Sequence, residues 1–137
     1  MAVVYLTRRM YFSAAHRLHS EALSAEENAQ IYGLCNNPAG HGHNYELEVT
    51  VKGEPDPVTG MVIDLKVLKD IVQHVIIDRV DHKHLNTDVD FMRGLVPTAE
   101  NIVVAFWGQL RDKIPNGQLY ELTLYETPRN IVAYKGE

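Results

Sequence analysis

The stretch Cys35-Asn36-Asn37-Pro38-Ala39-Gly40-His41-Gly42-His43-Asn44-Tyr45 carries the only cysteine of the chain, six residues before a His-Gly-His pair. Apolar and polar residues then alternate through residues 43–52, which predicts a strand with one buried face. Side chains two positions apart share a strand face, so we expect His41 and His43 to lie on the apolar row. Two imidazoles there need polar partners or a metal ion, because an unpaired buried polar group costs free energy.

A third ligand is needed to separate these two readings. A lone histidine on an apolar face is usually a hydrogen-bonded core residue, and the His-x-His pattern by itself does not decide between a core pair and a metal pair. Residues 3–16 also alternate, and their apolar face ends at His16. Antiparallel pairing of the two strands would bring His16 beside the pair, so the sequence predicts a metal site at His16, His41 and His43.

Length and composition indicate one domain over residues 1–137. The net charge of −5 and the absence of a basic face argue against a nucleic-acid binder. No apolar run approaches the roughly 20 residues of a membrane span. A single cysteine excludes an internal disulfide, and the first residues lack the order of a secretory signal. We therefore expect a cytoplasmic protein with a small-molecule partner.

The rest of the chain predicts two helices and a final hairpin. A long connection over residues 17–40 leaves room for a short helical turn. Asp64 begins the first helix, which ends near residues 78–80, and Thr98 begins the second, which extends to Ile114 before Pro115. Residues 120–126 and 131–135 form the hairpin. The order ββααββ predicts an α+β fold, a four-stranded antiparallel sheet with both helices on one face.

Three histidines leave the fourth position of a zinc ion open, as in catalytic rather than structural sites, although imidazole suits other divalent transition metals too. Cys35 is a further ligand, or a base or nucleophile acting as its thiolate. Asp81 and His82 can form a carboxylate–imidazole pair, but only where the backbone bends, since adjacent strand side chains diverge. Glu126 continues an apolar row, which indicates a pocket or a salt bridge. His19 and His84 have no comparable context.

Several of these stretches together resemble the 6-pyruvoyltetrahydropterin synthase family in its animal form, over almost the whole chain. The matching stretches are Phe12-Ser13-Ala14-Ala15-His16-Arg17-Leu18, Cys35-Asn36-Asn37-Pro38, Gly40-His41-Gly42-His43-Asn44-Tyr45, Asp56-Pro57-Val58-Thr59-Gly60-Met61, Asp81-His82-Lys83, Glu126-Thr127 and Tyr134-Lys135-Gly136-Glu137.

The resemblance implies the tunnelling fold, whose sheets join into a barrel as trimers stack into a homohexamer. It implies a zinc-dependent lyase of tetrahydrobiopterin biosynthesis, which converts 7,8-dihydroneopterin 3'-triphosphate to 6-pyruvoyltetrahydropterin and triphosphate. His16, His41 and His43 would hold zinc. Cys35 would be the base, with Asp81 and His82 of a neighbouring subunit as its relay.

Glu126 would anchor the pterin ring, with Thr98 and Glu100 as further pocket residues. Here the chain departs from the family, which often has two threonines before the glutamate, whereas this run is Thr98-Ala99-Glu100. The residues that hold the triphosphate are not evident, and candidates rest on charge alone: Arg8, Lys66, Arg79, Lys83 and Lys135.

Two alternative functions remain at this point. A 6-carboxytetrahydropterin synthase would share the histidines, the cysteine and the glutamate. A non-catalytic pterin- or zinc-binding module would have no need of Cys35, Asp81 and His82.

Overall fold

Two long strands, β1 (Val4–His16) and β2 (His41–Gly53), form the centre of the structure, a computed structural model that describes residues 1–137. They pair antiparallel without interruption from Val4 opposite Gly53 to His16 opposite His41. The predicted pairing is thus confirmed. Alternate side chains of both strands are buried from Met10 to His16 and from Tyr45 to Val51, as the period-two pattern requires.

The sheet has five strands in the order β3-β1-β2-β4-β5, where four were predicted. β4 (Gln118–Tyr125) and β5 (Ile131–Tyr134) form the expected hairpin, and β4 pairs antiparallel with β2. The extra strand β3 (Lys83–His84) runs parallel to β1. Two residues have no detectable period, and this strand exists because backbone N–H groups on either side of it bond to the edge of β1.

The first predicted helix has three consecutive segments, α2 (Leu65–Val72), a π-helical turn η2 (Gln73–Ile77) and α3 (Asp78–Val80). Its predicted cap is confirmed, since the Asp64 side chain accepts from the N–H of Lys66 at 2.8 Å. The second helix, α4 (Ala99–Leu110), begins after its predicted cap Thr98. It ends four residues before Ile114, because tighter turns lead to Pro115, which disfavours helical backbone in the preceding residue.

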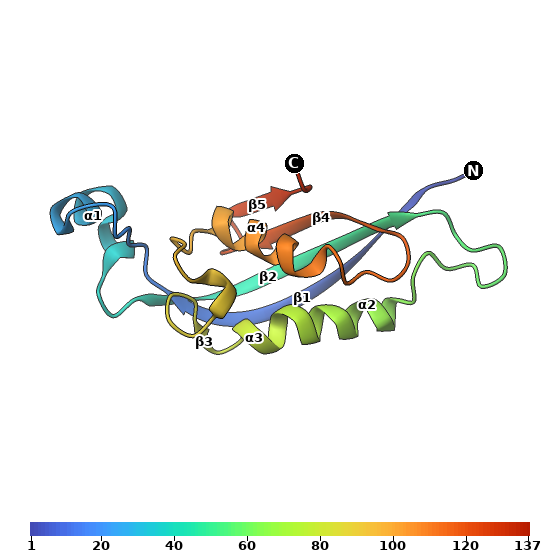
Figure 1. The fold of residues 1–137 in the computed structure, drawn as a ribbon, viewed down its shortest axis with the longest axis horizontal. Coiled ribbons are helices and arrows are strands. Elements are labelled where there is room, and N and C mark those ends of the chain that lie inside the picture. The colour runs from blue at the N-terminus through green and yellow to red at the C-terminus, as the bar shows by residue number, and fades with distance from the viewer.

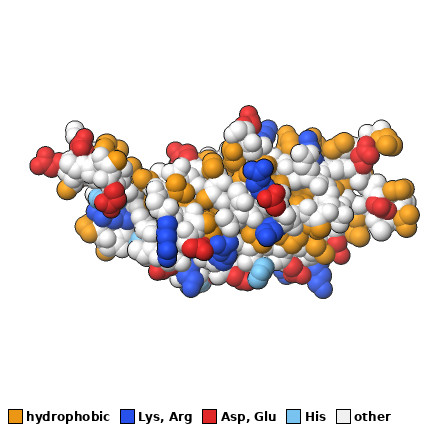
Figure 2. All heavy atoms as spheres, viewed as in Figure 1, with side chains coloured by type: hydrophobic (Ala, Val, Ile, Leu, Met, Phe, Trp, Pro, Cys, Tyr) orange, Lys and Arg blue, Asp and Glu red, His pale blue; other side chains and the backbone are white.

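All these helices cover the same face of the sheet, as predicted (Figure 1). α2 lies along β1, and α4 packs over β4 and β5. The core between the two layers consists of 25 buried apolar side chains, with Leu47, Leu68, Phe106 and Leu122 fully buried at its centre. Basic and acidic side chains are interspersed on the face shown in Figure 2.

The long connection between β1 and β2 forms an arm at one end of the molecule, with α1 (Ala25–Tyr32) and the 3₁₀ turn η1 (Gly33–Asn36) (Figure 1). Ser24 and Glu27 cap α1 reciprocally. The buried amide of Asn28 bonds the backbone at Ser20, Leu23 and Ser24. The arm is therefore an ordered unit, although its contacts with the helices and sheet are few.

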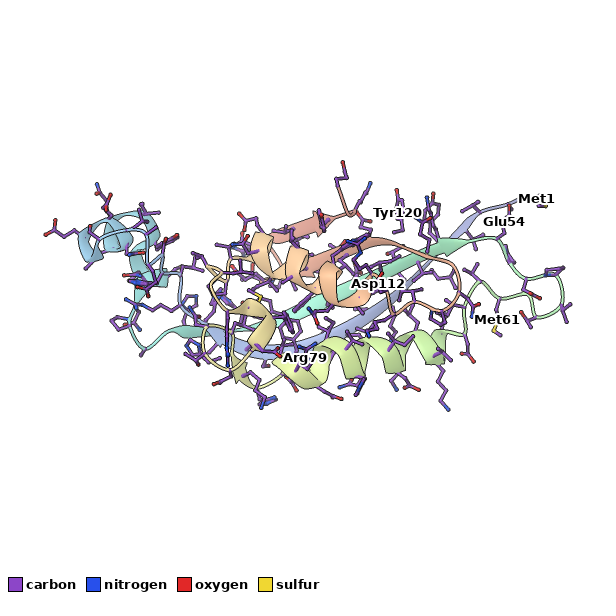
Figure 3. All side chains as sticks on the ribbon, in the orientation of Figure 1. Met1, Glu54, Met61, Arg79, Asp112 and Tyr120 are labelled. Carbon is purple, nitrogen blue, oxygen red and sulfur yellow. The ribbon has the colours of Figure 1, made fainter.

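A short 3₁₀ turn, η3 (Asp90–Met92), lies between β3 and α4. Arg79, labelled in Figure 3, bonds Asp90 at 2.7 Å and Gln109 at 2.8 Å and covers the ring of Phe91. The charge of Arg79 is therefore paired within the chain, and its side chain links α3 to η3 and α4. None of the helices combines the length and the apolar character that a membrane crossing requires.

Candidate active site

The three predicted histidine ligands converge at one end of the β1–β2 pair. One ring nitrogen from each of His16, His41 and His43 lies within 4.8 Å of the other two. The Nε2 atoms of His16 and His41 are 3.1 Å apart, because these residues are directly opposite in the strand register. His43 is on the same face two residues further along. The sequence prediction that these side chains share a site is confirmed, and the cluster does not include Cys35.

A hydrogen bond fixes the orientation of the His16 ring. Its Nδ1 lies 2.8 Å from the carbonyl oxygen of Pro97, in the turn before α4. A carbonyl can only accept, so Nδ1 carries the proton and the lone pair is on Nε2, which faces the other two rings. A hydrogen bond of this kind to the second ring nitrogen is typical of metal-binding histidines.

Burial keeps the deepest ring neutral. The pKa of His16 is lowered to about 4, chiefly by burial and also by the neighbouring histidines, while the bond to Pro97 acts in the opposite sense. Burial also lowers the pKa of His43, against the raising effect of the nearby Glu126 carboxylate. Neutral imidazole is the form that binds metal ions, so these two rings are ready for a ligand role without losing a proton near neutral pH.

The donor set fits a divalent metal ion. Nε2 of His43 is buried and has no hydrogen-bond partner within the chain, although buried polar atoms nearly always have one. A metal ion among the three rings would supply that missing partner. It would also take the place of the 3.1 Å contact between the Nε2 atoms of His16 and His41, in which only one of the two nitrogens can donate. We therefore describe the cluster as a candidate metal centre with three protein ligands.

Gly40 makes the close approach of β2 to this site possible. Its φ is +78°, in the left-handed region that favours glycine. A Cβ at this position would lie 2.9 Å from Nε2 of His84 and 3.0 Å from the carbonyl oxygen of His16. Glycine therefore lets the chain enter β2 against the end of β1, directly before His41.

Reciprocal bonds at the base of the arm tie Cys35 to the residues after His16. The N–H of Leu18 donates to the Cys35 carbonyl oxygen at 2.9 Å, and the amide of Asn36 donates to the Leu18 carbonyl oxygen at 2.8 Å. Arg17 donates to the Asn36 carbonyl oxygen at 2.9 Å. The half-buried thiol itself is free. The backbone therefore holds Cys35 close in space to the metal-site end of β1.

Asp81 and His82 form the predicted pair, at a bend. Their side chains are 3.0 Å apart, and His82 has a φ of 60°, which supplies the change of direction that the pair needs. The Asp81 carboxylate also accepts from the N–H of Ser13 at 2.9 Å, and this bond is the main reason that its pKa is lowered. The His82 side chain is 82% exposed, and no hydrogen bond within the chain links this pair to Cys35.

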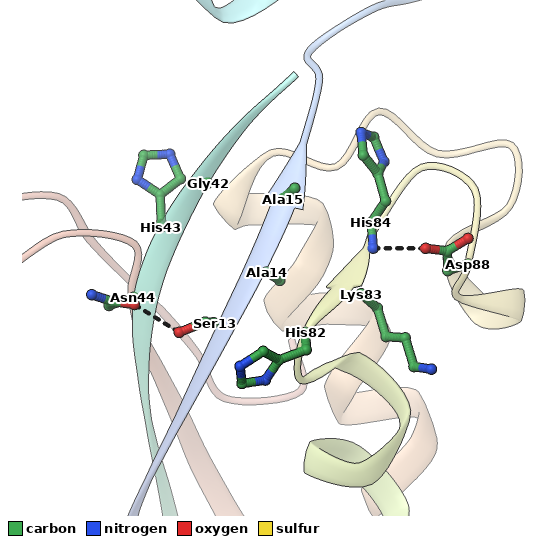
Figure 4. A pocket seen from close by; sticks show the side chains of 10 residues that line it. All are labelled: Ser13, Ala14, Ala15, Gly42, His43, Asn44, His82, Lys83, His84 and Asp88. Atoms are coloured by element: carbon green, nitrogen blue, oxygen red, sulfur yellow. Dashed lines mark hydrogen bonds between the residues drawn. The ribbon is translucent and has the colours of Figure 1, made fainter. Parts of the chain in front are cut away.

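His82 lies at the rim of an open pocket of about 560 Å³ over the ends of β1, β2 and β3 (Figure 4). His43 projects from β2 on one side of β1, and Lys83 and His84 lie on the other side (Figure 4). The pocket therefore exposes His82, the outer member of the pair, to whatever occupies this edge of the molecule.

A second depression of about 560 Å³ brings together the three predicted pocket residues, Thr98, Glu100 and Glu126. The Glu126 carboxylate lies 4.0 Å from Nε2 of His16, so this depression adjoins the metal centre. The Thr98 hydroxyl accepts from the N–H of Asn101 as the helix cap, and its own proton stays available to a ligand. The depression has the size of a small-molecule site.

Two residues near the metal centre have no signal in the sequence pattern. Pro97 contacts His16 through its backbone, which no side-chain pattern reveals. Tyr45, which is 1% exposed, stacks on Phe12 and places its hydroxyl 3.4 Å from Nδ1 of His16. Burial raises the pKa of Tyr45, so its hydroxyl stays protonated. Its position two residues after His43 on the same face is the one hint that the sequence offers.

Comparison with known proteins identifies close relatives. A family model described as 6-pyruvoyl tetrahydropterin synthase matches residues 5–137. A 6-pyruvoyl tetrahydrobiopterin synthase of Homo sapiens is 51% identical over 132 residues, covering 96% of this chain and 91% of that protein. The solved structure of the Caenorhabditis elegans 6-pyruvoyl tetrahydropterin synthase superposes with a TM-score of 0.95 at 47% identity, over 100% of this chain and 98% of the other.

A 6-carboxy-5,6,7,8-tetrahydropterin synthase of Rickettsia felis is more distant, at 28% identity over 148 residues, covering 95% of this chain and 99% of that protein. Of the two functions that the sequence left open for an enzyme on this scaffold, the pyruvoyl-forming one is thus the better supported.

Replacing a metal ligand tests the site. We expect His41→Ala to reduce metal affinity by more than about 100-fold, above the range for outer-shell residues, because it removes a direct ligand. The fold should persist, since His41 is outside the apolar core. Metal content by mass spectrometry and thermal unfolding by circular dichroism check both points. His74→Ala, which changes an exposed histidine remote from the site, is the control. Unfolding of the metal-free protein would instead mean that the ion is structural.

The charge of Asp81 gives a pH-dependent prediction. Its folded-state pKa lies below the usual value of about 3.9, so ionised Asp81 stabilises the fold at higher pH, and that contribution disappears as the pH falls through the folded pKa. We expect Asp81→Asn to lower the urea midpoint at about pH 5, and by less below about pH 3. The exposed Asp70→Asn is the control. A deficit that persists in acid would exclude the charge as its cause.

Proposed function

The chain belongs to the 6-pyruvoyl tetrahydropterin synthase family, and on this premise we propose that it acts as a lyase on 7,8-dihydroneopterin 3'-triphosphate, releasing triphosphate and 6-pyruvoyltetrahydropterin for tetrahydrobiopterin biosynthesis. The observation that carries the proposal is the convergence of three histidines beside a depression with an inward-facing carboxylate. We infer that residues 1–137 act as a single catalytic domain.

We propose zinc as the metal. Three neutral imidazoles with an open fourth position are a common catalytic zinc set. When bound, zinc would supply Lewis acidity toward the side-chain oxygens of the substrate, which makes hydrogens on the adjacent carbons more acidic. The chain holds the site ready through the Pro97 carbonyl, which keeps the Nε2 lone pair of His16 directed inward.

Glu126, Thr98 and Glu100 are proposed to bind the pterin ring. A carboxylate accepts hydrogen bonds from ring N–H groups and fixes the orientation of the bicycle, and Glu126 is well placed for this role, facing the depression 4.0 Å from His16. The Thr98 hydroxyl can donate to the ring. Ala99 has no side-chain donor, so a second contact at this point would come from a backbone amide.

Cys35 is proposed to be the base that removes a side-chain proton from the substrate, with Asp81 and His82 as its relay. The reaction is internally balanced, because the ring gains the two hydrogens that the side chain loses, and triphosphate leaves by elimination. No external reductant is needed. Within one chain the thiol and the pair make no contact, and the pair faces an exposed edge. We therefore propose that the relay acts on a thiol from a neighbouring subunit.

This arrangement requires an oligomer, which we propose to be a hexamer of two stacked trimers whose sheets join into a barrel. The outer edge of β1 is paired only at Ala14 and Ala15, and β5 has a free edge. Large side chains are exposed at both edges, including Tyr5, Tyr11 and Ile131. Joining such edges between copies would satisfy backbone groups that otherwise remain open to any pairing.

Product analysis tests the function. We expect the zinc-loaded protein to convert 7,8-dihydroneopterin triphosphate to 6-pyruvoyltetrahydropterin and triphosphate, whereas release of acetaldehyde would indicate a 6-carboxytetrahydropterin synthase. Cys35→Ala should lower turnover by roughly two or more powers of ten, the scale of a lost acid–base group, with zinc and pterin binding intact. Leu34→Ala, a change at the exposed neighbouring residue, is the control. Undiminished turnover in Cys35→Ala would remove the thiol from the mechanism.

Mixing two inactive variants tests the shared site. Cys35→Ala retains the relay, and His82→Ala retains the thiol, so co-refolding them should restore about one quarter of wild-type turnover if each site combines parts of two subunits at random in a closed ring. Neither variant refolded alone should regain turnover. If the mixture stays inactive while light scattering shows mixed hexamers, the thiol and relay act within one chain.

A further inference from the structure

The turn Val96-Pro97-Thr98 touches both halves of the site. The Pro97 carbonyl oxygen accepts from Nδ1 of His16 at 2.8 Å, and the next residue, Thr98, caps α4 and lines the depression with Glu100 and Glu126. One peptide unit thus separates a contact to the metal-binding ring from the first residue of the proposed pterin pocket. Proline at the centre makes the turn stiff, because its ring fixes φ.

Asn101 holds this turn in place. Its side-chain amide donates to the Val96 carbonyl oxygen at 2.8 Å, and its backbone N–H donates to the Thr98 hydroxyl at 3.2 Å. The Val96 carbonyl oxygen accepts a second bond from the N–H of Thr98 at 2.8 Å, so the three residues form a tight i to i+2 turn. Apart from the His16 ring on Pro97, Asn101 is the only side chain that bonds the backbone of this turn, and it lies in the first turn of α4.

We propose that Asn101 is a positioning residue that couples the metal centre to the pterin pocket. A pterin that contacts the N-terminus of α4 would restrict the turn and thereby fix the His16 ring, and a metal ion on His16 would restrict the turn in the same way. Each ligand would therefore raise the affinity for the other by the same factor. This inference rests on the proposed function, since it takes a metal ion and a pterin as the two ligands.

The experiment uses a probe without the side-chain oxygens that the proposed function directs to the metal, pterin with no substituent at C6, together with Zn²⁺ alone. Zinc affinity is measured by competition with a chromophoric chelator, with and without pterin, and pterin affinity by fluorescence with and without zinc. In the wild type we expect each ligand to tighten the other about fivefold, the lower end of usual coupling. Because the probe has no side-chain oxygens, coupling that depends on Asn101 has to pass through the protein.

Asn101→Asp separates positioning from simple stability. An acidic residue in the first turn favours the helix electrostatically, which offsets part of the stability lost with the amide bond, but an ionised carboxylate cannot donate to the Val96 carbonyl. We expect zinc affinity to fall about tenfold, as for an outer-shell contact, and the coupling to disappear. Asn101→Gln, which retains an amide donor, should recover part of the zinc affinity and part of the coupling.

The outcomes are distinct. A folded Asn101→Asp protein that keeps wild-type zinc affinity and full coupling would overturn the inference. So would a wild type that binds both probes independently, although the proposed function would then stand. A wild type that binds neither probe would refute the proposed function, and this inference with it.

Discussion

The antiparallel register of β1 and β2 determines the geometry of the site. His16 lies directly opposite His41, so the two rings leave the same face of the sheet at the same level, and His43 follows two residues along. A shift of one residue would move either histidine set to the opposite face, away from the others. The continuous apolar row that begins at Tyr45 and Met10 prevents such a shift, because it would also expose the core. The packing that stabilises the fold therefore also places the ligands.

This placement leaves neutral polar rings in an apolar setting. Burial disfavours the charged form of His16 and His43, and although the rings of His16 and His41 are in hydrogen-bond contact, His43 keeps an unpartnered nitrogen. An apolar core would be more stable without them. The Pro97 carbonyl compensates only one nitrogen of one ring. One nitrogen of each ring lies within 4.8 Å of the other two, which suits a metal ion, and hydrogen bonding inside the chain does not account for the His43 nitrogen.

Period and capping explain how much of this could be predicted. The long strands could be predicted because successive strand side chains point to opposite faces, which produces alternation over many residues. The starts of α2 and α4 could be predicted because an Asp or Thr cap accepts hydrogen bonds from free N–H groups of the first turn. The three histidines could be grouped because they end two such rows. β3 is too short for any period, and the Pro97 contact is made by backbone, so neither could be predicted. The Asp81–His82 hypothesis requires a bend in the backbone, and the structure has that bend at His82, where no sequence signal marks it. The roles of Cys35, Asp81, His82, Glu126, Thr98 and Glu100 stay predictions.

Packing of the core fixes the positions of some of the candidate site residues but not of the others. His16, His41 and His43 stand on strands whose alternate residues are buried, and Glu126 directly follows β4, so their positions follow from packing. Cys35 lies on an arm held by backbone bonds at its base, and His82 lies at an exposed bend beside an open edge of the sheet. On the proposed function, a single chain would thus place the metal and pterin ligands, while the thiol and the Asp81–His82 pair lie at two places where a second chain could close the site.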